Sequence, residues 1–555
     1  MPSSPSRSLP SRLKALLIGL AVLAAAVALS ACGSGGSSTE AYVAKPPEIE
    51  DWPLFGRDRD NTRFATQDEI NTGNVDDLGE AWSTDLGPDQ FLMESFPLVI
   101  GEEVFVTTST DEIMSIDGKT GHVNWTYTPE VDFSQSTGVG GYGVSVNRGV
   151  AAENGKLFLL TFDDKLQAVS QKTGERLWSS TVADAHTGAY ESMAPTAYDG
   201  KVYVGDSGSE DGVRGFVAAY DQKTGKKLWQ FYTVPKAGTG WVPKGGGGGT
   251  IYMPPTVDPK TGILYVGTGN PAPVIVGAKR PGKNLYTDSL LALDANTGEL
   301  LWYHQEQAHD LWDYDAESPV LLFNAEIEGH RRRGVAEAGK NGLLFLLDAK
   351  TGKNLFPSVP FVKRDHSPPT RKGTLECPGA VGGSQYSPLA YSPETQAVYV
   401  SGVNICMVLR VTFESTANGE KAFGGDRVVP KGTEKTGTFT AVETTTGEVL
   451  WKRDMPTPMD GGATATAGGL VFTGDQKGIL YAFDAENGDD LWQGNLKLAF
   501  GTAPVVYSID GTEYVLVTVG GAALTASEEL GEIGARVVAL KLGGKKLPPG
   551  PELKG

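Results

Sequence analysis

SIDGKTGHVNW, Ser115 to Trp125, is the stretch that decides the fold, because close copies of it recur along the chain. Each copy reads as a strand, a tight turn and a second strand. The Asp of most copies can bond the turn backbone, the Gly supplies a position with positive φ, and the terminal aromatic residue is a large apolar anchor. Six further copies end at Trp178, Trp229, Trp302, Phe356, Trp451 and Trp492, and VVALKLGG, Val537 to Gly544, resembles a degraded eighth copy.

Another strand pair precedes most copies, as in AGGLVFTG and GILYAF before Trp492, so each repeat contains about four strands. Four-stranded sheets repeated around an axis form a β-propeller, in which each sheet buries its faces against its neighbours. The sequence has 72 glycines and 33 prolines, and helical periodicity is absent beyond residue 32. We therefore predict an all-β fold, an eight-bladed β-propeller of four-stranded antiparallel blades over residues 49–545, with residues 546–555 as a C-terminal tail.

The ends of the chain are expected to close this ring. The opening segment, with Trp52, Trp82 and the strand near PLVIGEEVFV, should pair with the C-terminal repeat. Spacing between the copies is uneven, longest between residues 352 and 447 and next longest between residues 225 and 298. We expect the extra length to form loops on one face, where the binding sites of propellers gather.

The first 32 residues read as a secretory signal rather than as part of the fold. Basic residues precede an apolar run over 15–29 that is too short for a comfortable transmembrane span. The run ends in LSAC, which looks like a bacterial lipobox and implies lipid on Cys32; the alternative is an ordinary signal peptide with an incidental Cys. Residues 33–48 would then be a flexible tether, and the protein is expected to be exported and anchored to the cell membrane as a lipoprotein, at the outer face or in the periplasm.

Charge and cysteine content narrow the partners. The formal net charge of −19 and the pI near 4.9 argue against nucleic acid, because phosphate binding needs clustered Lys and Arg. The one basic cluster, HRRR at residues 330–333, reads as a surface loop. Two cysteines follow Cys32, Cys377 and Cys406, and in an exported protein this even count permits one disulfide, with a free buried pair as the alternative.

The stretch HDLWDYD, residues 309–315, places three carboxylates and an aromatic pair in seven residues. Asp313 and Asp315 flank Tyr314, so in an extended segment both carboxylates point the same way. Two like charges so close are costly to bury unless a cation or a shared proton compensates. The stretch is therefore either a solvated acidic loop or part of a site that holds a cation.

Nearly the whole chain after the tether, from DWPLFGRDRDNTRFA to GTAPVVYSIDGTEYVLVTVGG, resembles the eight-bladed quinoprotein dehydrogenases that use pyrroloquinoline quinone (PQQ), the methanol, ethanol and membrane glucose dehydrogenases. The segments between the repeats carry the resemblance: GDSGSEDGVRGF, YVGTGNPAP and HDLWDYD. It implies a Ca²⁺ or lanthanide ion held by oxygen ligands. The implied ligands are Glu210, Asn270, Asp313 and Asp315, with Asp313 also the catalytic base and Asp315 resembling the further ligand of lanthanide-dependent members.

The resemblance also implies a set of contacts to PQQ. Lys340, in GKNGLLFLLD, stands where a cation polarises the quinone oxygens, on which negative charge develops. The other implied contacts are Glu94, Arg148, Ser192, Ser207, Gly208, Ser209 and Thr250. Cys377 and Cys406 match a structural disulfide of some members.

Several positions depart from the family pattern. Tyr142-Gly143 replaces the pair of bonded cysteines that covers one face of the quinone in many members, and Tyr252 replaces the stacking Trp. Membrane glucose dehydrogenases also lack the cysteine pair, and both tyrosines can cover a planar ring with less area than Trp. Gln385 stands where Asn is common, and Asp460 where several members have Trp.

The sequence therefore predicts a dehydrogenase that oxidises an alcohol or sugar hydroxyl. Asp313 would take the hydroxyl proton, and electrons would pass from PQQ to a separate acceptor, a cytochrome or a quinone, because the sequence contains no CxxCH haem site. A non-catalytic propeller lipoprotein, a scaffold for cell-envelope assembly or a binding protein, would show the same repeats. A third alternative is a degenerate dehydrogenase that binds the metal but not the quinone.

Overall fold

The computed structural model describes residues 51–87, 90, 92–134, 145–412, 423–521 and 534–553. The chain divides into two compact units, Met1–Pro46 and Pro47–Gly555, and every described residue belongs to the second. The predicted signal peptide with Cys32, the predicted tether and Tyr142 lie outside the described residues. No helix in the described part of the chain is long and apolar enough to cross a membrane.

Sheets of four sequential antiparallel strands make up the first half of the molecule, and the strands alternate with tight turns. Four such sheets follow one another: β3 (Leu98–Ile100), β4 (Glu103–Thr107), β5 (Ile113–Asp117) and β6 (Val123–Tyr127); β7 (Ala151–Glu153), β8 (Lys156–Thr161), β9 (Lys165–Ser170) and β10 (Arg176–Thr181); β11 (Thr196–Tyr198), β12 (Lys201–Val204), β13 (Phe216–Asp221) and β14 (Lys227–Tyr232); β15 (Thr256–Asp258), β16 (Ile263–Gly267), β17 (Ser289–Asp294) and β18 (Leu300–Gln305).

The second half contains four more such sheets and one additional three-stranded sheet, and two N-terminal strands join the last two of the four. Its sheets are β19 (Leu321–Ile327), β20 (His330–Ala338), β21 (Leu343–Asp348) and β22 (Val359–Pro360); β24 (Ala390–Ser392), β25 (Ala397–Asn404), β28 (Thr436–Glu443) and β29 (Val449–Met455); β30 (Ala463–Thr466), β31 (Leu470–Gly474), β32 (Ile479–Asp484) and β33 (Asp490–Asn495), with β1 (Phe64–Ala65) beside β30; and β34 (Val505–Ile509), β35 (Thr512–Gly520) and β36 (Ala535–Leu542), with β2 (Leu78–Asp85) beside β36.

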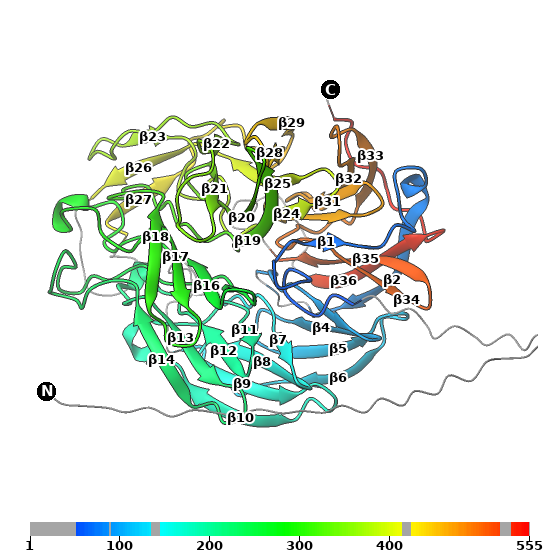
Figure 1. Cartoon of the computed structure of the whole chain (residues 1–555), viewed down its shortest axis with the longest axis horizontal. Coiled ribbons are helices and arrows are strands. Elements are labelled where there is room, and N and C mark those ends of the chain that lie inside the picture. The colour runs from blue at the N-terminus through cyan, green and yellow to red at the C-terminus, as the bar shows by residue number, and fades with distance from the viewer. Residues whose placement is uncertain are drawn as a thin grey trace, which may run out of the picture. The chain divides into compact units, whose positions relative to one another are not determined.

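Helical structure in the described part of the chain is confined to short 3-10 turns, η1 (Val75–Asp77), η3 (Ala185–Thr187), η4 (Ser209–Asp211) and η5 (Gly277–Lys279). Figure 1 shows the sheets arranged around a common centre, with the fourth strands, such as β6, β10 and β14, at the rim. The predicted all-β propeller of antiparallel four-stranded sheets is confirmed. The predicted pairing of the opening segment with the C-terminal repeat is also confirmed, because Trp82 on β2 pairs with Ala539 on β36.

The repeated module explains how neighbouring sheets hold together. In the turn after β17, Asp294 accepts backbone N–H bonds from Asn296 and Thr297, and Gly298 has a φ of 73°. A Cβ on Gly298 would lie 2.5 Å from the ring of Trp229, so only glycine fits beneath the indole of the preceding sheet. The indole N–H of Trp229 then donates to the carbonyl of Ala295 in the same turn, at 3.3 Å. Trp229 thus joins its own sheet to the turn of the next one.

We expected the longest insertion to form loops, but part of it forms a sheet. Between residues 352 and 447 the chain builds a separate three-stranded antiparallel sheet of β23 (Thr374–Glu376), β26 (Met407–Val411) and β27 (Gly425–Val428). Apolar side chains explain this, since the buried Met407 and Leu409 pack into one cluster with Trp312 and Tyr314. The structure also joins Cys377 to Cys406 in a disulfide beside this sheet.

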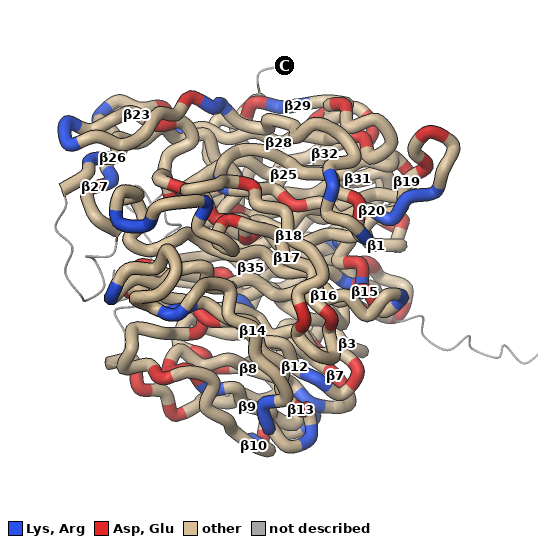
Figure 2. Tube along the Cα trace, turned by 60° about the vertical axis from the view of Figure 1, so that its left-hand side comes forward, with Lys and Arg blue, Asp and Glu red and all other residues tan. Residues whose placement is uncertain are grey.

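The basic cluster at residues 330–333 is not a loop either, because it opens strand β20. Its first three residues are exposed, and Figure 2 shows the β19–β20 hairpin reaching the right edge of the molecule. The fourth, Arg333, is held by an ion pair to Asp60 of the N-terminal segment. The cluster therefore partly serves to attach the N-terminal segment.

Segments that precede the first strand of successive sheets contact one another, because Arg148 donates to Ser192 and to the carbonyl of Tyr252, and Tyr252 donates to Asp315. Most of the predicted site residues lie in these segments: Glu94 before β3, Arg148 before β7, Ser192 before β11, Tyr252 before β15, Asp313 and Asp315 before β19, and Gln385 before β24.

Candidate functional site

A tight turn that Asp310 stabilises positions Asp313. The two carboxylate oxygens of Asp310 accept backbone N–H bonds from Trp312 at 3.1 Å and from Asp313 at 3.0 Å. Asp313 has a φ of 74°, which a residue with a side chain rarely adopts unless its surroundings impose it. The carbonyl of Asp310 in turn accepts a hydrogen bond from the buried Arg280. The predicted base is therefore held in a strained backbone conformation, as active-site residues often are.

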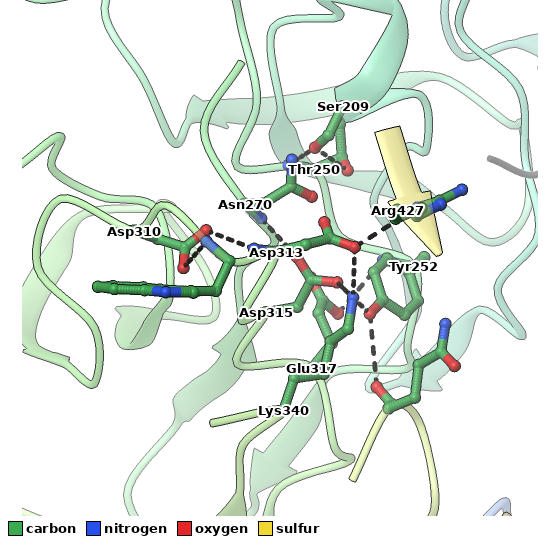
Figure 3. A network of polar contacts seen from close by, with 12 residues as sticks. Ser209, Thr250, Tyr252, Asn270, Asp310, Asp313, Asp315, Glu317, Lys340 and Arg427 are labelled. Atoms are coloured by element: carbon green, nitrogen blue, oxygen red, sulfur yellow. Dashed lines mark hydrogen bonds and ion pairs between the residues drawn. The ribbon is translucent and has the colours of Figure 1, made fainter. Parts of the chain in front are cut away.

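Lys340 is a buried cation between two buried carboxylates (Figure 3). Its Nζ lies 3.1 Å from Oδ2 of Asp313 and 2.8 Å from Oδ2 of Asp315. Burial opposes the charge on Lys340, but the two carboxylates outweigh it and hold the pKa of Lys340 above its ordinary value. Burial raises the pKa of Asp313 well above its ordinary value, Lys340 opposes that rise, and the charges of Asp315 and Glu210 add to it. Lys340 is thus the shared ion-pair partner of Asp313 and Asp315.

Asp315 connects the elements of the site. Its Oδ1 accepts the backbone N–H of Asn270 at 2.6 Å, and its Oδ2 accepts the hydroxyl of Tyr252 at 2.8 Å as well as the ammonium of Lys340. Both oxygens therefore have partners from the protein. The assignment of Asp315 as a metal ligand stays a prediction, and such a ligand would have to share these hydrogen bonds.

The donor set around Asp313 suits a hard cation. Oδ1 of Asp313 is buried and has no hydrogen-bond partner, and Glu210, on the short turn η4, has its pKa raised by burial and by the charge of Asp315. Within the described residues no group of three or more His, Cys, Asp and Glu side chains has a metal-binding arrangement, so the amide oxygen of Asn270 is needed to complete a ligand set. Carboxylate and amide oxygens are the ligands that Ca²⁺ and similar ions prefer. The residues present fit the predicted cation.

A second network adjoins the first and contains Arg148. Its guanidinium lies 2.6 Å from Glu94 and donates to the hydroxyl of Ser192 at 2.9 Å, while its Nε is buried without a partner. The guanidinium also lies about 5 Å from the ring centres of Tyr252 and Tyr386. A buried guanidinium with one unused donor suits a planar anion such as a carboxylate of PQQ. The residues present therefore also fit the predicted cofactor.

Small polar residues complete the wall between the two networks. The hydroxyl of Ser192 lies 2.8 Å from that of Ser207, and Ser209 lies 2.8 Å from Thr250. Gly208 has a φ of 104°, and a Cβ there would lie 2.6 Å from a backbone oxygen, so the wall cannot carry a larger residue at this point. Gln385 contacts the site through its main-chain carbonyl, which accepts a hydrogen bond from the Tyr252 hydroxyl at 3.4 Å.

Three residues of the site were missed by the sequence analysis. Arg427 lies 3.8 Å from Oδ2 of Asp313, Tyr386 stacks on Arg148, and the buried Glu317 accepts the N–H of Tyr252 at 3.4 Å. Glu317 lies two residues beyond Asp315, and this continued alternation of acidic residues could have marked it as part of the site. Arg427 and Tyr386 are single residues in the long insertion, and no local pattern marks them.

Two family profiles match the chain. Residues 52–362 match the profile described as glucose/ethanol/alcohol dehydrogenase, beta-propeller domain, and residues 435–533 match the profile of the outer membrane protein assembly factor BamB. The quinohemoprotein alcohol dehydrogenase of Comamonas testosteroni is 33% identical over 89% of this chain and 76% of its own length. The dehydrogenase subunit of the alcohol dehydrogenase (quinone) of Gluconobacter oxydans is 32% identical over 91% of this chain and 76% of its own length.

Solved structures give the same result. A quinohemoprotein alcohol dehydrogenase of Pseudomonas putida superposes with a TM-score of 0.83 at 29% identity, over 91% of this chain and 82% of the other. A europium-containing methanol dehydrogenase superposes with a TM-score of 0.80 at 27% identity, over 89% of this chain and 98% of the other. The chain belongs to the PQQ-dependent alcohol dehydrogenase family, whose named members are oxidoreductases acting on CH–OH donors.

Proposed function

We propose that this chain is an exported, lipid-anchored quinoprotein dehydrogenase that oxidises an alcohol or sugar hydroxyl. One observation carries the proposal: a buried, strained Asp313 lies beside Lys340 and keeps one carboxylate oxygen without a partner. In the same proposal the eight sheets of four or five strands are the eight blades of the propeller, and the three-stranded sheet is an addition to the ring. Family membership supports the PQQ-dependent class.

The side chains have separate roles in this proposal. Asp313 takes the proton of the substrate hydroxyl, and Asp310 fixes the direction in which Asp313 points. Glu210, Asn270 and Asp313 would hold the cation, and Arg148 would bind a carboxylate of the cofactor. PQQ, when bound, supplies the acceptor for the hydride of the alcohol carbon. Lys340 provides a fixed positive charge beside the reacting groups.

We also propose a preference for the more highly charged of the two kinds of cation. Asp315 adds a third carboxylate to the surroundings of the metal, and an added carboxylate favours a trivalent ion on electrostatic grounds. The solved europium-containing methanol dehydrogenase shows that a protein of similar fold carries a lanthanide. Asp315→Ala should shift the preference from La³⁺ toward Ca²⁺, measured as dye reduction with each ion; equal activity with both ions before and after the change would refute this preference.

Export, anchoring and electron transfer belong to the same proposal. LSAC with Cys32 supports lipidation, and the following Gly/Ser-rich residues support a tether to the membrane surface. The absence of CxxCH from the sequence supports transfer of the electrons to a separate cytochrome or quinone. Mass spectrometry of membrane-extracted protein tests the anchor, because lipid on Cys32 adds to the mass of the chain. In addition, Cys32→Ser should release the protein from the membrane fraction.

The decisive experiment is reconstitution of the purified protein. We expect protein incubated with PQQ and Ca²⁺ or La³⁺ to retain the quinone, seen by absorbance and by mass spectrometry of the holoprotein, and to reduce a dye with members of an alcohol and sugar panel. Asp313→Asn should keep the quinone and lose dye reduction. Neither bound quinone nor dye reduction with any substrate would overturn the proposal, while metal binding without quinone would indicate a degenerate dehydrogenase.

A second candidate function is a non-catalytic propeller lipoprotein that acts in cell-envelope assembly or binds a ligand. The match of residues 435–533 to the BamB profile favours it. Such a protein has no use for Glu210 and Asp313 together, so Glu210→Ala and Asp313→Ala would leave its assembly function intact. Complementation of an envelope-assembly defect by both variants would support this alternative over the dehydrogenase.

A further inference from the structure

Arg427 reaches the site from outside the ring of four-stranded sheets. It lies on β27, the edge strand of the added three-stranded sheet, and pairs in register with the fully buried Leu409. Neighbouring positions of a strand point to opposite faces, so Arg427 shares the inward face with Leu409, while Asp426 and its partner Arg410 face outward. The inward direction places the guanidinium next to Asp313, at 3.8 Å.

Arg427 lies on the solvent side of Asp313. The side chain of Arg427 is 23% exposed, whereas those of Asp313 and Lys340 are 4% and 3% exposed. The Arg427 guanidinium also lies over the ring of Phe423, 4.8 Å from its centre, and this contact helps to hold it in place. Arg427 is therefore more accessible to a molecule from solvent than Asp313 and Lys340 are.

Asp313 has a closer cationic partner than Arg427, so neutralising Asp313 is not the only role open to Arg427. Oδ2 of Asp313 already receives the ammonium of Lys340 at 3.1 Å, closer than the guanidinium. A guanidinium presents several N–H donors in one plane and matches a carboxylate better than any other side chain does.

We propose that Arg427 selects substrates that carry a carboxylate close to the hydroxyl, so that the natural substrates are short hydroxycarboxylates rather than plain alcohols. The hydroxyl faces Asp313 and the carboxylate faces Arg427. This inference rests on the proposed dehydrogenase function and adds a substrate class to it. The short distance between the two side chains limits the separation of the two substrate groups to a few bonds.

The test uses protein loaded with PQQ and Ca²⁺ and a matched pair of substrates, 3-hydroxypropanoate and its neutral amide. We expect kcat/KM to favour the acid over the amide roughly 10- to 100-fold, the range that a hydrogen-bonded charge pair supplies. In Arg427→Gln this ratio should fall to near one, mainly through a higher KM for the acid. Arg427→Lys should recover part of the ratio, because it keeps the charge without the fork of donors.

Arg410→Gln is the matched control, since Arg410 lies in the same sheet, carries the same charge and faces outward with a side chain 50% exposed. It should keep the wild-type ratio. An unchanged ratio in Arg427→Gln, or a wild-type preference for the amide, overturns the inference.

Binding of propanoate, which has no hydroxyl to oxidise, gives a readout independent of activity. Calorimetry should show roughly 10-fold weaker propanoate binding to Ca²⁺-loaded Arg427→Gln than to the wild type and to Arg410→Gln. Should no variant reduce the dye with either substrate, the proposed dehydrogenase function fails, and the propanoate titration alone decides whether Arg427 binds a carboxylate. Equal affinity in all three proteins would then refute it.

Discussion

Asp164 offers a direct test of how this protein tolerates buried acid groups. It lies in the turn between β8 and β9 with a φ of 58°, is fully buried, and neither of its carboxylate oxygens has a hydrogen-bond partner. Burial raises its pKa from 3.8 to about 7, and the charges of Asp163 and Asp184 add to the rise. We therefore expect the folded protein to keep Asp164 protonated where the unfolded chain is already ionised.

The sign of the effect on stability follows from proton binding. Between the pKa of Asp164 in the unfolded chain and its pKa in the folded protein, the folded state holds a proton that the unfolded chain has released. The contribution of Asp164 to the free energy of unfolding is therefore fully present below about pH 4 and is lost as the pH rises to about 7. A shift of about three pKa units corresponds to an upper bound of ~4 kcal/mol lost above the folded pKa. Asp164→Asn removes the titrating group and keeps a residue that tolerates positive φ. At pH 8 the variant should be more stable than the wild type by up to this amount, and near pH 4 the two should differ little.

Calorimetry at pH 4, 6 and 8 measures this difference. With an unfolding entropy of about 2.1 cal/mol/K per residue and roughly 500 folded residues, ~4 kcal/mol corresponds to about 4 °C in Tm. Asp199→Asn is the control, because Asp199 also has positive φ, at 49°, but its side chain is 74% exposed. The reasoning fails if Asp164→Asn and wild type keep a constant difference in Tm across the three pH values, or if the control shows the same trend.

Three other substitutions test the repeat and the site. Gly298→Ala, whose new Cβ would lie 2.5 Å from an indole ring, should lower Tm more than Gly200→Ala, which has the same positive φ and nothing within 4 Å; equal losses would show that strain of the backbone alone matters. Asp310→Ala removes the turn that orients Asp313, the proposed base, and should lower kcat by about 10-fold or more with bound quinone retained, seen by absorbance. Tyr252→Phe keeps the ring and removes the hydroxyl that donates to Asp315 and to the main-chain carbonyl of Gln385, so quinone affinity by titration should change less than about 5-fold while kcat falls.

The propeller could be predicted because its determinants are local and repeated. The turn that contains Gly298 and the strand that carries Trp302 lie within a dozen residues, and seven copies share this glycine and a terminal Trp or Phe. The sequence did not show which glycine lies under which indole, because that contact joins consecutive copies rather than residues within one copy. The added sheet was harder to predict, since its strands are short and pair across residues 376–407 with no repeat to mark them.

The site could be predicted in part, for a related reason. Asp313 and Lys340 lie in segments with a recognisable family pattern, and the structure brings them within 3.1 Å of each other. Arg427 comes from the added sheet, where neither periodicity nor a neighbouring motif distinguishes an inward arginine from the outward Arg410. The direction in which Arg427 points depends on the register with Leu409, which is a tertiary property and cannot be read from single residues.

The buried acids of this protein fall into two groups that a proton and a metal ion should affect differently. Asp313 and Asp315 adjoin Lys340 and the oxygen donors that suit a cation, so a bound metal can keep them ionised. Burial raises the pKa values of Asp164, Glu191 and Asp206, and the charge of Asp164 adds to the rise at both Glu191 and Asp206, so protonation is expected to neutralise this second group. Loading with Ca²⁺ should therefore raise Tm at pH 8 through the first group. It should leave in place the fall in stability that Asp164 causes between about pH 4 and 7, because Asp164 is not one of the predicted metal ligands.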